Sequence, residues 1–216
     1  MTSTLQPSSE TPSKPQITSS NTQEYRHRLA DISSRACISD TLNTLFQGEK
    51  IGSASQVTVE ELYISTLLRI ETKVSLGAQI VEADNFAAVV CWEPPGALRS
   101  LDLEELEVIA KTRPIYASFL RNIQSARSEC LGVEKKCWQF TLMARDPLRT
   151  SRGAVRAVLE PFLKKAKEER LPVWCVAGNE RARDVYAYFG FRVVKVVYSG
   201  EERVRTWCMV CNWPVE

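Results

Sequence analysis

The sequence predicts a mixed α/β fold with a central sheet, and three observations support this class. Segments with apolar residues at helical spacing are separated along the chain by short apolar runs. In addition, Trp138, Phe140, Leu142 and Ala144 occupy every second position of 138–144, as on one face of a strand. The second half follows the order strand, helix, strand, helix, strand, strand, which is typical of a sheet covered by helices. Of the 216 residues, 44% are hydrophobic and 25% are charged, a balance that allows a sizeable core.

Residues 1–22 are predicted to be a disordered tail, and residues 23–216 a single domain. The first segment is rich in Ser, Thr and Pro, and its larger apolar side chains are Met1, Leu5 and Ile17. Burying so little apolar surface does not offset the entropy lost when the segment becomes ordered. We therefore expect the domain to fold without this tail.

Three segments of the first half have helical spacing, namely 25–46, 58–75 and 101–130. The first is broken into two short apolar faces, and the last is interrupted at Pro114. The second of them begins with a capping box, in which the side chains of Thr58 and Glu61 accept each other's backbone N–H groups. Two apolar runs follow this helix, at 79–83 and 86–92. The residues Asp84-Asn85 between them favour a turn, so the pair is expected to form a hairpin.

The second half is expected to hold strands at 138–144, 173–176, 191–198 and 204–211, and helices at 155–166 and 180–189. Pro161 lies inside the first of these helices, where it removes one backbone hydrogen bond and is expected to bend the helix. Cys208 and Cys211 form a C-x-x-C in the last strand. Residues three apart on a strand point to opposite faces, so this pair does not predict a zinc site.

Charge and hydropathy exclude several classes of protein. The net charge of +2 arises from 28 basic and 26 acidic side chains, without the basic excess of a nucleic-acid binder. No apolar run reaches the ~20 residues that span a bilayer, and residues 1–10 lack the apolar stretch of a secretory signal. The seven cysteines lie mostly in apolar runs, as buried free thiols do. We expect a cytoplasmic protein, with the nucleus as the alternative compartment.

The chain contains one histidine, His27, which restricts the available chemistry. A Ser-His-Asp or Cys-His nucleophile system and a multi-histidine metal site are therefore not expected. A general base must be a carboxylate, a tyrosine, a cysteine, a lysine or water. No metal site is predicted.

Residues 145–154 join a predicted strand to a predicted helix and have the composition of a phosphate-binding loop. Small residues at Ser151, Gly153 and Ala154 would let phosphate oxygens approach the free N–H groups of the helix start. Arg149 and Arg152 would add positive charge. On the pattern alone, an ordinary helix start is an equally good interpretation.

Four stretches of the sequence are similar to motifs of one family. They are Asp146-Pro147 followed by Arg152-Gly153-Ala154, Leu159-Glu160-Pro161-Phe162-Leu163, Glu180-Arg181 leading to Tyr186 and Gly190-Phe191, and Val89-Val90-Cys91-Trp92-Glu93-Pro94-Pro95-Gly96. Together they resemble the GNAT N-acyltransferase superfamily, especially its small fungal-type members. The resemblance covers Tyr25 to Trp213 in the order of elements.

The resemblance implies a mixed, mostly antiparallel sheet that splays between two central strands and is flanked by helices. It places acyl-CoA, with acetyl-CoA as the first expectation, in the wedge between strands 138–145 and 172–177. The implied cofactor-binding residues are Met143, Ala144, Arg145, Arg149, Thr150, Ser151, Arg152, Gly153, Ala154 and Val155. The first three would meet the pantetheine arm through their backbone groups, and the others would hold the pyrophosphate.

Tyr186 occupies the position of the family's general acid, which protonates the departing thiolate. The alternative for Tyr186 is a helix tyrosine packed on the sheet. The general base stays open among Glu93, Asp146, Glu180 and water. The acceptor site is expected between the 25–47 helices, the 93–125 region and the last hairpin, with Trp92, Glu93 and Tyr116 as candidate contacts. For each aromatic residue, packing in the core is the favoured alternative.

The loop departs from the family's pattern at two positions. Thr150 stands where Gln or Arg is usual, and Val155 stands where Gly or Ala is usual. The expected function is direct transfer of an acyl group to a small amine or hydroxyl, in a monomer or a dimer. The alternative is a protein of the same fold with a degenerate CoA loop, which binds a small molecule or a partner or catalyses another tailoring reaction.

Overall fold

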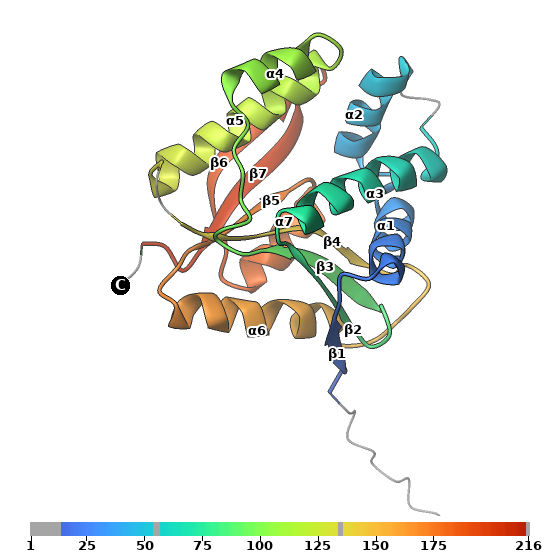
Figure 1. The fold of residues 1–216 in the computed structure, drawn as a ribbon, viewed down its shortest axis with the longest axis vertical. Coiled ribbons are helices and arrows are strands. Elements are labelled where there is room, and N and C mark those ends of the chain that lie inside the picture. The colour runs from blue at the N-terminus through green and yellow to red at the C-terminus, as the bar shows by residue number, and fades with distance from the viewer. Residues whose placement is uncertain (1–13, 54–56, 134–135, 215–216) are drawn as a thin grey trace, which may run out of the picture.

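The computed structural model of the chain describes residues 14–53, 57–133 and 136–214 (Figure 1). One sheet contains β1 (Ile17–Ser19), β2 (Gln79–Ala83), β3 (Ala88–Glu93), β4 (Trp138–Arg145), β5 (Val173–Ala177), β6 (Arg192–Ser199) and β7 (Val204–Cys211). Its strand order is β1-β2-β3-β4-β5-β7-β6, and β4 with β5 is the parallel pair among antiparallel neighbours. The predicted mixed, mostly antiparallel sheet is confirmed.

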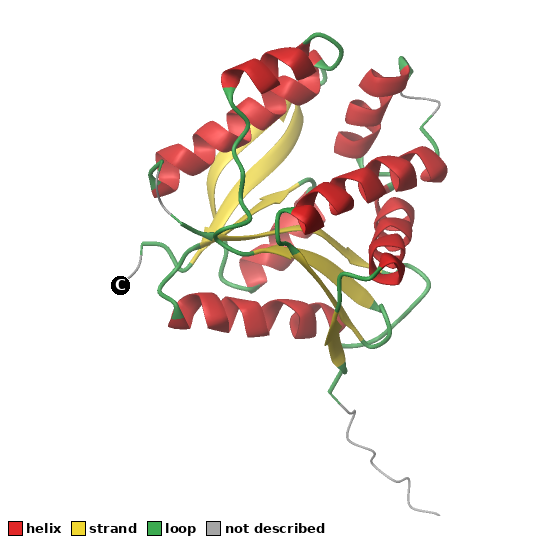
Figure 2. Cartoon of the chain, in the orientation of Figure 1, coloured by secondary structure: helices red, strands yellow, loops and turns green. Residues whose placement is uncertain are grey.

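The helices of the described residues flank this sheet (Figure 2). They are α1 (Gln23–Cys37), α2 (Thr41–Ile51), α3 (Val59–Ser75), α4 (Leu103–Ala110), α5 (Pro114–Leu131), α6 (Ala154–Glu168) and α7 (Glu180–Tyr188). The capping box of Thr58 and Glu61 begins α3 as predicted, and Asp102 with Glu105 forms a second one at α4. Pro114 opens α5, because the first helical position needs no N–H donor. No described helix is long and apolar enough to span a membrane.

The prediction that residues 1–22 form a disordered tail is wrong for its described part. Residues 17–19 form β1, which pairs with β2 through Ile17↔Ala83, Thr18↔Glu82 and Ser19↔Val81. The Asn21 side chain completes the contact by donating to Ala78 O and accepting from Ile80 N. Backbone pairing along a sheet edge needs few apolar side chains, so the composition gave no signal for it. Residues 1–13 lie outside the described part of the chain.

The two faces of the sheet are covered differently. On one face, α6 and α7 bury a single core that includes Trp92, Phe140 and Tyr186. On the other face, α1 and α3 cover the β2–β4 half, whereas α2 and α5 cover the β5–β7 half. The division between these two halves falls at the boundary between β4 and β5.

The sheet opens at this boundary. Within the described residues, β4 and β5 pair at Trp138↔Val173 and Gln139↔Trp174, and their pairing stops there. On the other side of β4, the register with β3 shifts between Val89 and Cys91, and Leu142 has a φ of 55°. This bulge turns the strand locally. The later part of β4 therefore has backbone groups on the β5 side that no strand occupies.

Candidate active site

A cleft of about 1160 Å³ lies where β4 and β5 separate. Its walls are the end of β4, the loop that follows, the first turn of α6, one side of α7 and the end of α1. The lining residues are Ala36, Cys37, Met143, Ala144, Arg145, Asp146, Pro147, Arg149, Thr150, Val155, Arg156, Asn179, Arg181, Ala182, Asp184, Val185, Tyr188 and Phe189.

The first turn of α6 presents free backbone donors to this cleft. Gly153 is the N-cap residue with a φ of 82°, a left-handed conformation that favours glycine. Gly153 has no side chain with which to cap this helix end, and the first turn carries no acidic residue. The N–H groups of the first turn have no partner inside the helix, and the helix dipole adds partial positive charge there.

The charged side chains of the lining favour an anion. Four are arginines, Arg145, Arg149, Arg156 and Arg181, and two are aspartates. Both aspartates are already neutralised, Asp146 by Arg35 at 2.9 Å and Asp184 by Arg183 at 2.8 Å. Arg156 is paired with Glu160 at 3.3 Å, so the positive charge next to the helix start comes mainly from Arg145, Arg149 and Arg181. This charge matches a phosphate-containing ligand.

Six of the ten predicted cofactor-binding residues line the cleft: Met143, Ala144, Arg145, Arg149, Thr150 and Val155. The other four, Ser151, Arg152, Gly153 and Ala154, shape the loop without lining it, and Ala154 is buried in the core beneath α6. The small residues at these positions therefore serve the tight entry into the helix. Contact of the first six with a cofactor stays a prediction.

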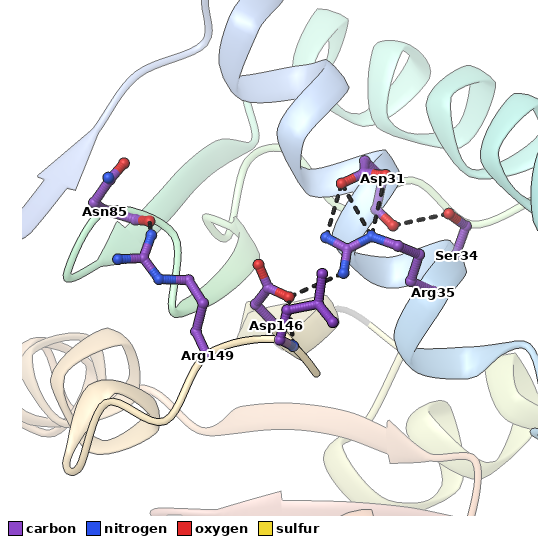
Figure 3. A network of polar contacts seen from close by, with 7 residues as sticks. Asp31, Ser34, Arg35, Asn85, Asp146 and Arg149 are labelled. Carbon is purple, nitrogen blue, oxygen red and sulfur yellow. Dashed lines mark hydrogen bonds and ion pairs between the residues drawn. The ribbon is translucent and has the colours of Figure 1, made fainter.

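A polar network fixes the loop after β4 (Figure 3). Asp146 Oδ1 accepts from Arg35 Nη1 at 2.9 Å and from Leu148 N at 2.9 Å. On the other side, Arg149 donates from its guanidinium to the Asn85 carbonyl. Burial alone would raise the pKa of Asp146, but the hydrogen bonds from Arg35 and Leu148 and the charge of Arg149 outweigh it and lower the pKa. An engaged carboxylate of lowered pKa is a weak general base.

Tyr186 lies behind the cleft wall. Its side chain is 5% exposed, and its ring packs edge-on against Phe140, with 5.0 Å between the ring centroids. Burial raises the pKa of Tyr186 above its ordinary value, and the nearby Cys175 and Cys37 add to the rise. The phenol stays protonated at any ordinary pH, but it is a weaker acid than a free tyrosine. The tyrosine that lines the cleft is Tyr188, two residues further along α7.

The two other proposed general bases are not in the cleft lining. Glu93 is 5% exposed, forms an ion pair with Lys73 at 2.7 Å, and accepts hydrogen bonds from Gln139 and Thr141. Glu180, in the first turn of α7, lies 3.3 Å from Arg205 at the surface. The geometry therefore gives no support to either carboxylate as the base.

None of the three predicted acceptor-site residues, Trp92, Glu93 and Tyr116, lines the cleft. Trp92 is fully buried, donates from Nε1 to Val158 O at 3.0 Å and stacks on Phe162, so its prediction as an acceptor contact is wrong. Its apolar run, 86–92, has no alternation, so the face to which each side chain points was not readable. The Tyr116 ring packs on Phe46 and under the Arg113 guanidinium instead.

Sequence reasoning missed the contribution of α7 to the cleft and did not identify Ala36 and Cys37 of α1. The α7 residues Arg181, Ala182, Val185, Tyr188 and Phe189 follow helical spacing, so they share one side of the helix. That spacing was visible in the sequence once Asn179 was recognised as the N-cap, which accepts from Ala182 N at 2.9 Å. Ala36 and Cys37 carry no comparable signal.

The two thiols of the C-x-x-C pair lie on opposite faces of the sheet. Cys208 packs in the core under α2 and α5, and Cys211 in the core under α6, on the opposite face of the sheet. Burial raises the pKa of Cys208 to about 12, so its thiol stays protonated. The described residues contain no cluster of three or more potential metal ligands.

The fold is that of the GNAT acyltransferases. The chain superposes on mosquito arylalkylamine N-acetyltransferase-like 5b with a TM-score of 0.59 and 12% identity, covering 90% of this chain and 99% of the other. Arylalkylamine N-acetyltransferase 2 from Aedes aegypti superposes with a TM-score of 0.59 and 10% identity, covering 90% of this chain and 97% of the other. A structure described as histone acetyltransferase HPA2 and related acetyltransferase, from Corynebacterium glutamicum ATCC 13032, superposes with a TM-score of 0.58 and 16% identity. The superposition covers 92% of this chain and 96% of the other. At such identities the likeness establishes the fold.

No family model matches the sequence. Among curated proteins, the chain is similar to increased recombination centers protein 11 of Saccharomyces cerevisiae (strain ATCC 204508 / S288c). The two are 28% identical over 89 residues, which are 41% of this chain and 57% of the yeast protein. The chain therefore spans little more than half the length of this relative.

Proposed function

We propose that this protein is an acyl-CoA-dependent acyltransferase that transfers an acyl group, acetyl in the first instance, to a small amine or hydroxyl. The observation that carries the proposal is the cleft at the opening between β4 and β5, bordered by an uncapped helix start and four arginines. A long, phosphate-bearing thioester fits a cleft of this shape and charge. The solved acetyltransferases that share the fold support the same class of reaction.

The reaction would be a direct transfer in which the chain mainly orients its two substrates. The unpaired β4 backbone beyond Gln139 supplies hydrogen-bond donors for the pantetheine arm and for the thioester carbonyl. The first turn of α6 and the arginines would hold the phosphates. Holding both reactants in one cleft replaces a bimolecular encounter with an effectively unimolecular step, which is a large source of rate acceleration.

In this proposal Tyr186, which lies behind the cleft wall, would act on the departing thiolate through hydrogen bonding at most, without complete transfer of its proton. A phenol of raised pKa is a weaker acid than the thiol it would create, whose pKa is about 8.5 in an unperturbed cysteine. Full proton transfer would therefore be uphill. For the general base, the engagement of Asp146 and Glu93 in ion pairs favours water, or an acceptor amine that arrives neutral.

A second candidate, a binding protein without transfer activity, is favoured by Val155. This residue lines the cleft in the first turn of α6, where its branched side chain takes space next to the free N–H groups. Thr150 adds a hydroxyl but no charge to the same wall. A protein of this kind would bind a nucleotide-like ligand in the cleft without releasing CoA.

The proposal is tested by measuring CoA release from acetyl-CoA with a panel of arylalkylamines, polyamines and amino acids. Mass spectrometry of the acylated product excludes simple thioester hydrolysis. Turnover that saturates with the concentration of one acceptor, and that disappears in Arg145→Glu, would support the transferase. Binding of acetyl-CoA without release for any acceptor would instead support the second candidate.

A further inference from the structure

Two polar contacts connect the diverging strands through one short segment, residues 35–40, which we call the bridge. The bridge comprises the last turn of α1 and the link to α2. At one end, Arg35 Nη1 lies 2.9 Å from Asp146 Oδ1, directly after β4. At the other end, Asp40 Oδ2 lies 2.6 Å from Asn179 Nδ2, two residues after β5. The bridge thus reaches from the end of one strand to the end of the other.

Each end of the bridge is held by more than one bond. The Arg35 guanidinium is fixed on α1 by Asp31, through Nε at 3.2 Å and Nη2 at 2.8 Å. Asp40 uses its other oxygen, Oδ1, to cap α2 by accepting from Leu42 N at 3.0 Å. Bonds that restrict a side chain to one geometry make the contact it carries more rigid.

The partner of Asp40 is equally committed. Asn179 Oδ1 accepts from Ala182 N and caps α7, so its amide nitrogen must point toward Asp40. Leu42 also lies close to this segment, because a β-carbon added at Gly178 would be 3.5 Å from Leu42 Cδ2. The start of α7 is therefore attached to the start of α2.

The bridge also contributes to the cleft wall. Ala36 and Cys37, between its two ends, line the cleft together with Asp146 and Asn179. Because β4 and β5 stop pairing after Gln139↔Trp174, backbone bonds between them do not fix the width of the opening near Arg145 and Ala177. The bridge contacts both ends through Arg35 and Asp40.

We propose that the bridge sets the width of the opening between β4 and β5, and that Arg35 and Asp40 are positioning residues for acyl transfer. This inference rests on the proposed transferase function. Neither residue needs to touch a substrate. A change in width shifts the α6 and α7 walls relative to the β4 backbone, and a shift of about 1 Å can lower the rate of an oriented reaction by up to ~10²-fold.

The chain offers a substitution that opens one contact without removing a helix cap. In Asp40→Asn, the new amide oxygen still caps α2, because Asn and Asp are equally good N-cap residues. The new amide nitrogen at position 40 would then face the amide nitrogen of Asn179, and the hydrogen bond between them is lost. In the double variant Asp40→Asn with Asn179→Asp, the amide donates to a carboxylate whose other oxygen still caps α7. This exchange restores the contact with the donor and acceptor reversed.

The test compares these variants with Asp102→Asn, which makes the same change at the N-cap of α4, outside the cleft lining. We expect Asp40→Asn to lower kcat/KM for acetyl-CoA by about tenfold or more. The double variant should recover to within about twofold of the wild-type value, and Asp102→Asn should stay within the same range. Wild-type rates in Asp40→Asn, or no recovery in the double variant, would overturn the inference.

Hydrogen exchange provides a readout that does not depend on activity. Asp40→Asn should accelerate amide exchange at 178–183 at least threefold, and the double variant should reverse the change. If the wild-type protein transfers no acyl group but exchange behaves in this way, the proposed function fails and the bridge stands as a structural element. Unchanged exchange in Asp40→Asn would overturn the bridge whatever the activity.

Discussion

The Nη1 atom of Arg35 lies 2.9 Å from Oδ1 of Asp146 and joins the last turn of α1 to the residue after β4 (Figure 3). The Asp146 side chain is 10% exposed, and the same oxygen accepts the N–H of Leu148. One carboxylate therefore holds the beginning of the loop that leads to α6. The pair also predicts how stability depends on pH.

Asp146→Asn should lower the free energy of unfolding by about 1–3 kcal/mol at pH 7, the usual range for a buried hydrogen bond to a charged group. Folding lowers the pKa of Asp146, so the stabilisation is fully present above about pH 4 and is lost as pH falls through the lowered pKa. Urea unfolding at pH 7 and pH 3 checks this. Equal losses of unfolding free energy in Asp146→Asn at pH 7 and at pH 3 would contradict this pH dependence. The exposed Asp184 gives a matched control, Asp184→Asn, with an expected effect below about 0.5 kcal/mol.

Deleting residues 2–20 should lower the melting temperature by at least about 4 °C, because it removes β1 and its pairing with β2. The Thr18 hydroxyl, which contacts Tyr25 and Glu82, adds to this contact. Thr18→Ala in the full chain should cause a smaller drop, since the strand remains. A melting temperature within one degree of wild type for the deletion would show that β1 contributes nothing.

Substitutions at Thr150 should change acetyl-CoA affinity in opposite directions. Thr150 is exposed and lines the cleft beside the start of α6, so a new side chain there is tolerated by the fold. Thr150→Arg should tighten binding several-fold and Thr150→Glu should weaken it by a similar factor. Both effects should shrink at 0.5 M salt. Changes of the same sign in both variants would mean that the phosphates bind elsewhere.

Tyr186→Phe should lower turnover by about tenfold while the affinity for acetyl-CoA stays nearly constant. The effect is placed at the low end of the range for general acids because burial raises the pKa of Tyr186. Tyr198→Phe, on the half-exposed Tyr198 of β6, is the matched control and should keep full turnover. If Tyr186→Phe turns over as fast as wild type, the hydroxyl has no catalytic role.

The order and type of the elements could be predicted because their signals are local. The capping box of Thr58 and Glu61, the turn at Asp84-Asn85 and the alternation at 138–144 each specify their own element. The contributions to the site that went unpredicted depend on tertiary contacts. The bridge from Arg35 to Asp146 links residues 111 positions apart, and no local pattern encodes it.

The errors have physical causes as well. The expectation that Trp92 contacts the acceptor is wrong because a strand buried on both faces shows no alternation. Without alternation, the sequence does not indicate the face to which each side chain points. Residues 17–19 were placed in a tail because an edge strand bonded through its backbone needs little apolar surface. Tyr186 was identified by its distance from Gly190-Phe191, but spacing along a chain does not report how deeply a side chain is buried.

Isothermal titration of acetyl-CoA into the wild-type protein tests the central claim, that the cleft between β4 and β5 binds acyl-CoA, most directly. We expect one site per chain with a Kd below about 1 mM, an affinity that falls as salt increases, and loss of binding in Arg145→Glu. No heat of binding and no thermal stabilisation at millimolar acetyl-CoA would contradict it.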